Sequence, residues 1–123
     1  MIFGIGTDII EIRRMEKSVL SPRFLEKVFS AEEQEYCEAR GKQRIQSYAA
    51  RWAAKEAFTK ALGTGLSGGS MAEIEILSGE NGKPYLKLSE DWQKQLPKGA
   101  RVHVSLSHVK EYATAECLIE ICE

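Results

Sequence analysis

The chain has 123 residues, of which 43% are hydrophobic and 28% are charged. These values predict one globular domain over 1–123 and exclude a disordered or collagen-like chain. Eighteen acidic and seventeen basic residues give a net charge of −1, so we expect neither a nucleic-acid partner nor a membrane partner. We recognise no membrane-spanning run and no signal-peptide pattern in the sequence, and we therefore expect a cytoplasmic protein.

The cysteine and histidine content limits the kinds of metal site. Cys37, Cys117 and Cys122 form no CxxC pair, and the chain has only His103 and His108 besides them. We therefore expect reduced thiols rather than a disulfide framework or a zinc site. Any metal should be a hard ion held by carboxylates.

The first half of the chain is predicted to be mostly helical, with elements over 2–7 (a strand), 10–18, 22–28, 31–39 and 43–62. Ser21-Pro22 is typical of a helix start, and Ser30 with Glu33 forms a capping box. Alanine and long unbranched side chains favour the longest helix, which Gly63 can end in a left-handed conformation.

The second half changes to a period of two after a glycine-rich connection. Strands are predicted over 73–76, 85–88, 102–106 and 113–121, with a short helix over 89–96. Asn81-Gly82 indicates a hairpin turn. Together the elements predict an α+β fold: an antiparallel sheet packed on one long helix and several short helices.

Glu56 lies on the apolar stripe of the long helix, together with Ala49 and Trp52, and Lys60 lies one turn further on. A carboxylate in this position should be partly buried, which is costly unless a cation compensates its charge. One interpretation is an i,i+4 ion pair with Lys60. The other is a metal ligand or a general base.

Asp8 follows a glycine-bearing strand, Gly4-Ile5-Gly6-Thr7, and is expected at the strand's end. It is either the N-cap of the next helix or a ligand of a hard metal. Asp8 and Glu56 together could hold Mg²⁺ and leave positions open for water and phosphate.

Basic residues gather in two places. Six basic residues and one acid, Glu56, lie between positions 40 and 60, the bases being Arg40, Lys42, Arg44, Arg51, Lys55 and Lys60. This pattern indicates either a solvated helix face or a local anion site. A second group around Arg14 could dock an acidic partner. His108, at the end of a strand, either closes the core or donates to a phosphate.

Several segments together resemble the holo-[acyl-carrier-protein] synthase family, the small class of 4′-phosphopantetheinyl transferases. They are GIGTDIIEI at 4–12, FSAEE at 29–33, RWAAKEAFTKALGTG at 51–65, ENGKPYL at 80–86 and VSLSHVKEYATA at 104–115. The first and third are the most specific, since an Asp after a glycine-bearing strand and a W/F-x-x-K-E-x-x-x-K helix are typical of this superfamily.

The resemblance implies the 4′-phosphopantetheinyl transferase fold and an Mg²⁺-dependent transfer of phosphopantetheine from coenzyme A to a serine of apo-acyl-carrier protein. It further implies a homotrimer with coenzyme A between subunits. Asp8 and Glu56 would hold Mg²⁺, and Glu56 and Lys60 would be catalytic, with Glu56 or a metal-bound water as the base. The implied coenzyme A contacts are Arg51, Lys60, Gly63, Pro84 and His108, and the implied carrier-docking residues are Arg14 and Phe24.

Two other functions stay open at this point. One is a regulatory domain that binds an adenine nucleotide without covalent transfer. The other is a scaffold that uses its basic helices only to hold an acidic partner.

Overall fold

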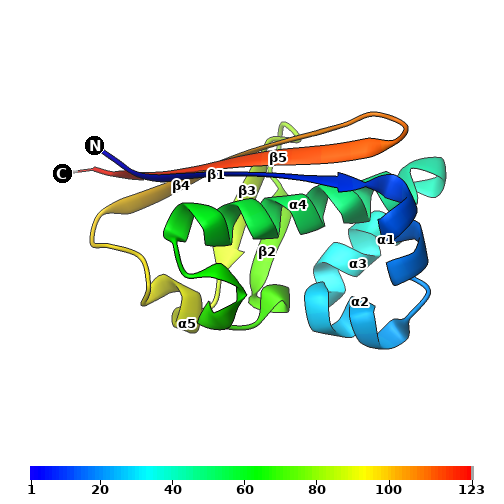
Figure 1. The fold of residues 1–123 in the computed structure, drawn as a ribbon, viewed down its shortest axis with the longest axis horizontal. Helices are drawn as coiled ribbons and strands as arrows, with labels where there is room; N and C mark the ends of the chain where they lie inside the picture. The colour runs from blue at the N-terminus through cyan, green and yellow to red at the C-terminus, as the bar shows by residue number, and fades with distance from the viewer. Residues whose placement is uncertain (123) are drawn as a thin grey trace.

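Helices occupy most of the first half of the chain and strands most of the second, in the α+β class that the sequence predicts (Figure 1). The computed structural model describes residues 1–122, without the side chains of residues 66 and 67. The main elements are β1 (Ile2–Glu11), α1 (Ile12–Ser18), α2 (Pro22–Val28), α3 (Ala31–Glu38), α4 (Arg44–Leu62), β2 (Ile74–Ser78), β3 (Pro84–Leu88), α5 (Glu90–Gln93), β4 (Ala100–His108) and β5 (Tyr112–Ile121).

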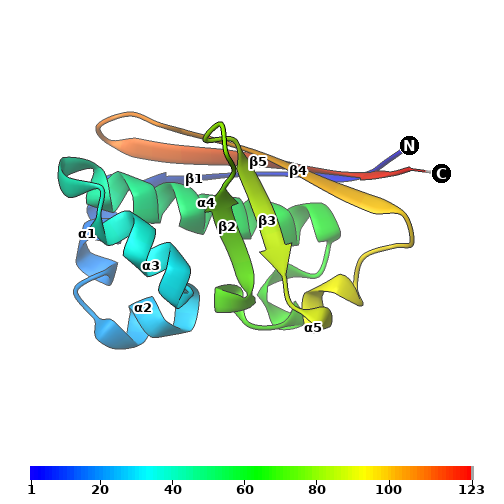
Figure 2. The same ribbon diagram turned by 180° about the vertical axis from the view of Figure 1, so that it is seen from behind.

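The long helix α4 is the centre of the molecule. One of its sides packs on an antiparallel sheet with the strand order β1-β5-β4. Its other sides contact the short helices α1 and α3 and the β2–β3 hairpin, which crosses the helix (Figure 2). Thirteen of its nineteen residues are buried, so α4 forms the core that the other elements cover.

The face of α4 that meets the sheet is made of alanines, because the helix and the strand approach each other closely. Ala57 and Ala61 are both buried there. A Cβ atom added at Gly4 would overlap the carbonyl oxygen of Ala61, and one added at Gly6 would overlap that of Ala57. The glycines of β1 therefore allow backbone-to-backbone packing, as expected where a side chain has no space.

The first strand is longer than the sequence predicts. It extends to Glu11, and Asp8 pairs with Ala115 of β5 in the middle of the ladder. The helix that follows has Glu11 at its N-cap position. The interpretation of Asp8 as a helix cap is therefore wrong, because strand pairing with β5 continues three residues beyond it.

Other local predictions are confirmed. Ser30 and Glu33 form a complete capping box at the start of α3, and Gly63 ends α4 with a φ of 90°. Trp52, on the apolar stripe of the long helix, is half-buried and packs against the core, and Trp92 of α5 is fully buried. Within residues 1–122, no helix is long and apolar enough to cross a membrane.

Candidate functional site

Asp8 and Lys60 form the first part of the site, where β1 lies against α4. The Lys60 Nζ atom is 3.1 Å from Asp8 Oδ1 and donates a 3.0 Å hydrogen bond to the carbonyl of Thr7. The Asp8 side chain is 16% exposed and that of Lys60 is 53% exposed. Among the described residues, the only ion-pair partner of Lys60 is the acid of the strand. The interpretation of Glu56 and Lys60 as an i,i+4 ion pair is therefore wrong, because the lysine reaches across to β1.

Glu56 lies one helical turn before Lys60 and is half-buried, as the sequence predicts. Burial raises the pKa of its carboxyl, the negative charge of Asp8 raises it further, and Lys60 opposes both effects. The two carboxylates therefore lie near enough to repel each other. One ammonium group balances only one of their two charges, so this place favours a further cation.

The chemistry of these donors fits Mg²⁺ better than a transition metal. Both candidate ligands, Asp8 and Glu56, offer carboxylate oxygens, which hard cations prefer. Among residues 1–122, no group of three or more His, Cys, Asp and Glu side chains forms a closed metal site. A metal on two carboxylates would keep positions free for a phosphate-bearing substrate.

Three of the expected coenzyme A residues line one cavity of about 460 Å³. Arg51, Pro84 and His108 come from α4, β3 and the end of β4, and Arg40 and Lys83 join them on the wall. His108 is exposed here, so it does not close the core. The described lining holds no acidic residue. The cavity is therefore an electropositive site suited to phosphate.

The remaining predicted site residues lie elsewhere. Gly63 is exposed at the end of α4 and is not among the described residues that line this cavity. Arg14 lines a shallow hollow with Arg13 and Lys17. Phe24 is half-buried on α2 and lines an apolar hollow with Trp52. The two expected docking residues thus belong to different hollows.

The structure also shows an ion pair that sequence reasoning missed. The Lys55 Nζ atom lies 2.7 Å from Glu33 Oε1, and both side chains are 0% exposed. Lys55 also donates to the carbonyls of Met71 and Ile74, and Glu33 accepts from the backbone N–H of Ile76. The pair ties α3 and the start of β2 to α4. No pattern in the sequence indicated this pair, because its two residues are 22 positions apart.

The basic residues of α4 consequently do not form one solvated face. Arg44 pairs with Glu38 at 2.8 Å, Lys55 is fully buried, and Arg51 is 6% exposed. Of these basic residues, Arg51 lines the electropositive cavity, and Lys60 lies beside Asp8.

Comparison with known proteins shows the family to which the chain belongs. The family model of the 4′-phosphopantetheinyl transferase superfamily matches residues 4–117. The holo-[acyl-carrier-protein] synthase of Fusobacterium nucleatum is 42% identical over 97% of this chain and 99% of the relative.

Solved structures of such synthases are also similar. The synthase of Bacillus anthracis, in complex with CoA (3′,5′-ADP), has a TM-score of 0.85 and 37% identity, with 99% of both chains covered. The synthase of Neisseria meningitidis has a TM-score of 0.88 and 34% identity, with 98% of this chain and 99% of that chain covered. The chain therefore belongs to the 4′-phosphopantetheinyl transferase superfamily and, within it, to the holo-[acyl-carrier-protein] synthase family.

Proposed function

We propose that this protein transfers the 4′-phosphopantetheine group of coenzyme A to a serine hydroxyl of apo-acyl-carrier protein and releases adenosine 3′,5′-bisphosphate. The observation that carries the proposal is the meeting of Asp8, Glu56 and Lys60 where β1 crosses α4. A relative of the same family is described in complex with CoA (3′,5′-ADP), which supports coenzyme A as the donor.

The transfer forms a bond between the serine oxygen and the phosphorus that carries the pantetheine arm. It breaks the bond from that phosphorus to the bridging oxygen of the pyrophosphate. Negative charge develops on the departing bisphosphate, and Lys60, which is 53% exposed, is the cation placed to stabilise it. Glu56, or a water beside it, is proposed to accept the serine proton.

Asp8 and Glu56 are the residues that would hold Mg²⁺. When bound, the ion supplies Lewis-acid neutralisation of the pyrophosphate charge. The two carboxylates come from a strand and a helix whose backbones are in contact, so the backbone positions from which they extend are set before any ligand arrives. Such pre-organisation is what efficient phosphoryl transfer requires.

The Arg51 cavity is the second half of the proposed coenzyme A site. Arg51 and Glu56 are five residues apart on one helix, which places them about 140° apart around its axis. Arg51 thus faces Pro84 and His108, and Glu56 faces Asp8. This separation supports a coenzyme A site that is shared between copies of the chain.

The outer face of the three-stranded sheet supports the same assembly. Phe3, Ile5 and Ile9 of β1 are 43%, 68% and 63% exposed, and none of the described elements covers this side of the sheet (Figure 1). Apolar patches of this kind are typical of protein–protein interfaces. We propose that this face takes part in the contacts of a homotrimer.

The carrier protein is proposed to dock near α1 and α2. Arg13, Arg14 and Lys17 line one hollow together with Glu11, and Phe24 lines a separate, apolar hollow with Lys27. An excess of basic groups suits an acidic protein partner, and such docking weakens as salt is added. The three free cysteines are compatible with the reducing cytoplasm, where we place the activity.

Mass spectrometry of apo-acyl-carrier protein, after incubation with this protein, coenzyme A and Mg²⁺, tests the proposal. We expect the carrier to gain the mass of phosphopantetheine, and to gain none when Mg²⁺ is removed by a chelator. The Asp8→Asn variant is the matched control, because it keeps the size of the side chain and loses the charge. A wild-type protein that binds coenzyme A but modifies none of several carriers would favour a nucleotide-binding regulator instead.

A further inference from the structure

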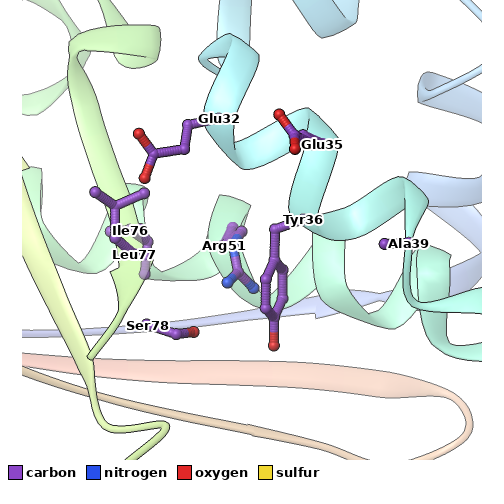
Figure 3. Close-up of a pocket in the computed structure, with 8 residues that line it drawn as sticks. All are labelled: Glu32, Glu35, Tyr36, Ala39, Arg51, Ile76, Leu77 and Ser78. Atoms are coloured by element: carbon purple, nitrogen blue, oxygen red, sulfur yellow. The ribbon is translucent and has the colours of Figure 1, made fainter. Parts of the chain in front are cut away.

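Tyr36 of α3 is an aromatic residue at the electropositive cavity that neither the sequence patterns nor the resemblance assigns to the site. The Cζ atom of Arg51 lies 4.1 Å from the centre of its ring, and that of Arg40 lies 5.5 Å from it. Figure 3 shows the Arg51 side chain pointing toward this ring from α4. Both arginines also line the cavity that contains Pro84 and His108. One ring thus contacts two of the cations that the cavity offers.

The charge of Arg51 has little other compensation. Arg51 is 6% exposed, and its Nε atom is buried without a hydrogen-bond partner. Among residues 1–122, no carboxylate lies within ion-pair distance of its guanidinium. A buried guanidinium normally needs a partner. Here the partner is the negative face of the Tyr36 ring, which leaves the hydrogen-bond donors available to a ligand.

A competing position for the guanidinium exists on the other side of Arg51. A second pocket of about 330 Å³ also has Arg51 and Tyr36 in its lining, and it carries two acids of α3, Glu32 and Glu35 (Figure 3). An arginine that turned toward these carboxylates would be neutralised by them. Because Tyr36 lines both hollows, its ring can hold Arg51 on the side of the acid-free cavity.

We propose that Tyr36 is a positioning residue for nucleotide recognition, whose ring holds the Arg51 guanidinium in the cavity, ready to bind a phosphate of coenzyme A. This inference rests on the proposed function, which supplies the phosphate-bearing ligand. It assigns Tyr36 to ligand binding and not to the transfer step, because the Asp8, Glu56 and Lys60 group lies on another side of α4.

The test is the binding of adenosine 3′,5′-bisphosphate, measured by titration calorimetry, together with steady-state kinetics for coenzyme A. Replacing the ring in Tyr36→Leu should weaken bisphosphate binding about tenfold, which lies between the typical effects of an exposed and of a desolvated cation–π contact. The KM for coenzyme A should rise by a similar factor, while kcat stays within about twofold. Tyr36→Phe keeps the ring and should behave as the wild type.

A further variant examines the competing acids. In Tyr36→Leu, adding Glu32→Gln and Glu35→Gln should restore part of the lost affinity, because the released arginine then has no carboxylate to turn to. Tyr36 is 37% exposed, so we expect the leucine variant to fold, as circular dichroism will verify. If it does not fold, Arg51→Lys takes its place, since lysine keeps the charge but lacks the planar stacking group.

The outcomes separate this inference from the proposed function. If Tyr36→Leu binds the bisphosphate as tightly as the wild type, the inference is overturned, and the proposed transfer activity is unaffected. The same holds for Arg51→Lys where that variant replaces Tyr36→Leu. Equal losses in Tyr36→Leu and Tyr36→Phe would assign the effect to the hydroxyl and would also overturn it. A wild-type protein that binds no bisphosphate and modifies no carrier would remove the proposed function itself, and the inference with it.

Discussion

Two lysines of α4, five residues apart, have opposite surroundings. Lys55 is 0% exposed and pairs with an equally buried Glu33, whereas Lys60 is 53% exposed and pairs with Asp8. The buried ammonium of Lys55 donates all its hydrogen bonds within the protein, to the Glu33 carboxylate and to two backbone carbonyls. The ammonium of Lys60 remains accessible to solvent. One helix thus carries both a lysine that stabilises the fold and a lysine that is proposed to contact the substrate.

Removing the buried lysine should have the largest effect. Lys55→Met leaves the Glu33 carboxylate buried without its partner, which typically costs about 3–5 kcal/mol of unfolding free energy. Urea denaturation followed by circular dichroism measures this loss. The matched control adds Glu33→Leu to the same chain. We expect the double variant to recover part of the stability, because no unpaired charge is left. A single variant as stable as the wild type would show that the pair is dispensable.

Removing the exposed lysine should act on the reaction instead. Lys60→Ala deletes the cation proposed to stabilise the leaving bisphosphate, and we expect kcat to fall about 10²-fold, as for the loss of one charge-stabilising donor. Its unfolding free energy should change by no more than about 1 kcal/mol, the usual range of an exposed ion pair. Lys60→Arg is the control that keeps the charge. A stability loss with unchanged turnover would reduce Lys60 to a structural partner of Asp8.

The pH dependence of stability tests the second acid of the site. Burial and Asp8 raise the pKa of Glu56, so the folded chain keeps this proton to higher pH than the unfolded chain. The stabilising contribution is complete below the ordinary pKa of a glutamate, and it is lost as the pH rises through the raised value.

Glu56→Gln should therefore gain stability relative to the wild type as the pH rises from 4 to 7, by less than about 1 kcal/mol because the group is half-exposed. Thermal unfolding of the metal-free proteins at several pH values measures this difference. Added Mg²⁺ should stabilise the wild type and leave the variant unchanged. Parallel pH profiles for both proteins would contradict the shift.

Thiol reactivity gives the smallest and most local signal. Burial raises the pKa of Cys37 and of Cys117 to about 12, while Cys122 is exposed. We expect iodoacetamide at pH 8 to modify Cys122 first, as resolved by peptide mass spectrometry. Lys55→Met also loses the buried ion pair with Glu33 that holds α3 on α4, so the core around Cys37 should open more often. Labelling of Cys37 should therefore accelerate in Lys55→Met and not in Lys60→Ala, although the loss of the Lys55 charge by itself raises the pKa of Cys37. Equal acceleration in both would remove the distinction between the two lysines.

The sequence predicted the local features of the fold well, because each depends on neighbouring residues. The capping box of Ser30 and Glu33 and the left-handed Gly63 are both formed by a few consecutive positions. The end of β1 was not predictable in this way. Its pairing with β5 connects residues more than 100 positions apart, and this pairing placed Asp8 inside the strand rather than at its end.

For the site too, the sequence predicted local features and missed contacts between distant residues. The spacing of α4 predicted a partly buried Glu56, and the structure confirms it. No helical periodicity could reveal that Lys55 points to a capping glutamate 22 residues earlier, since the capping box already accounts for Glu33. Nor could it show that Tyr36 meets Arg51. Such contacts arise only when α3 packs on α4, so they need the tertiary structure.

The glycine and alanine contact between β1 and α4 has a consequence for how this site can vary. Because main chain touches main chain at Gly4 and Gly6, a larger residue at either position would push the strand away from the helix. The distance between the two backbones therefore depends on two residues that carry no functional side chain. A substitution there would displace Asp8 from Glu56 and Lys60 while leaving all three of those side chains in the sequence.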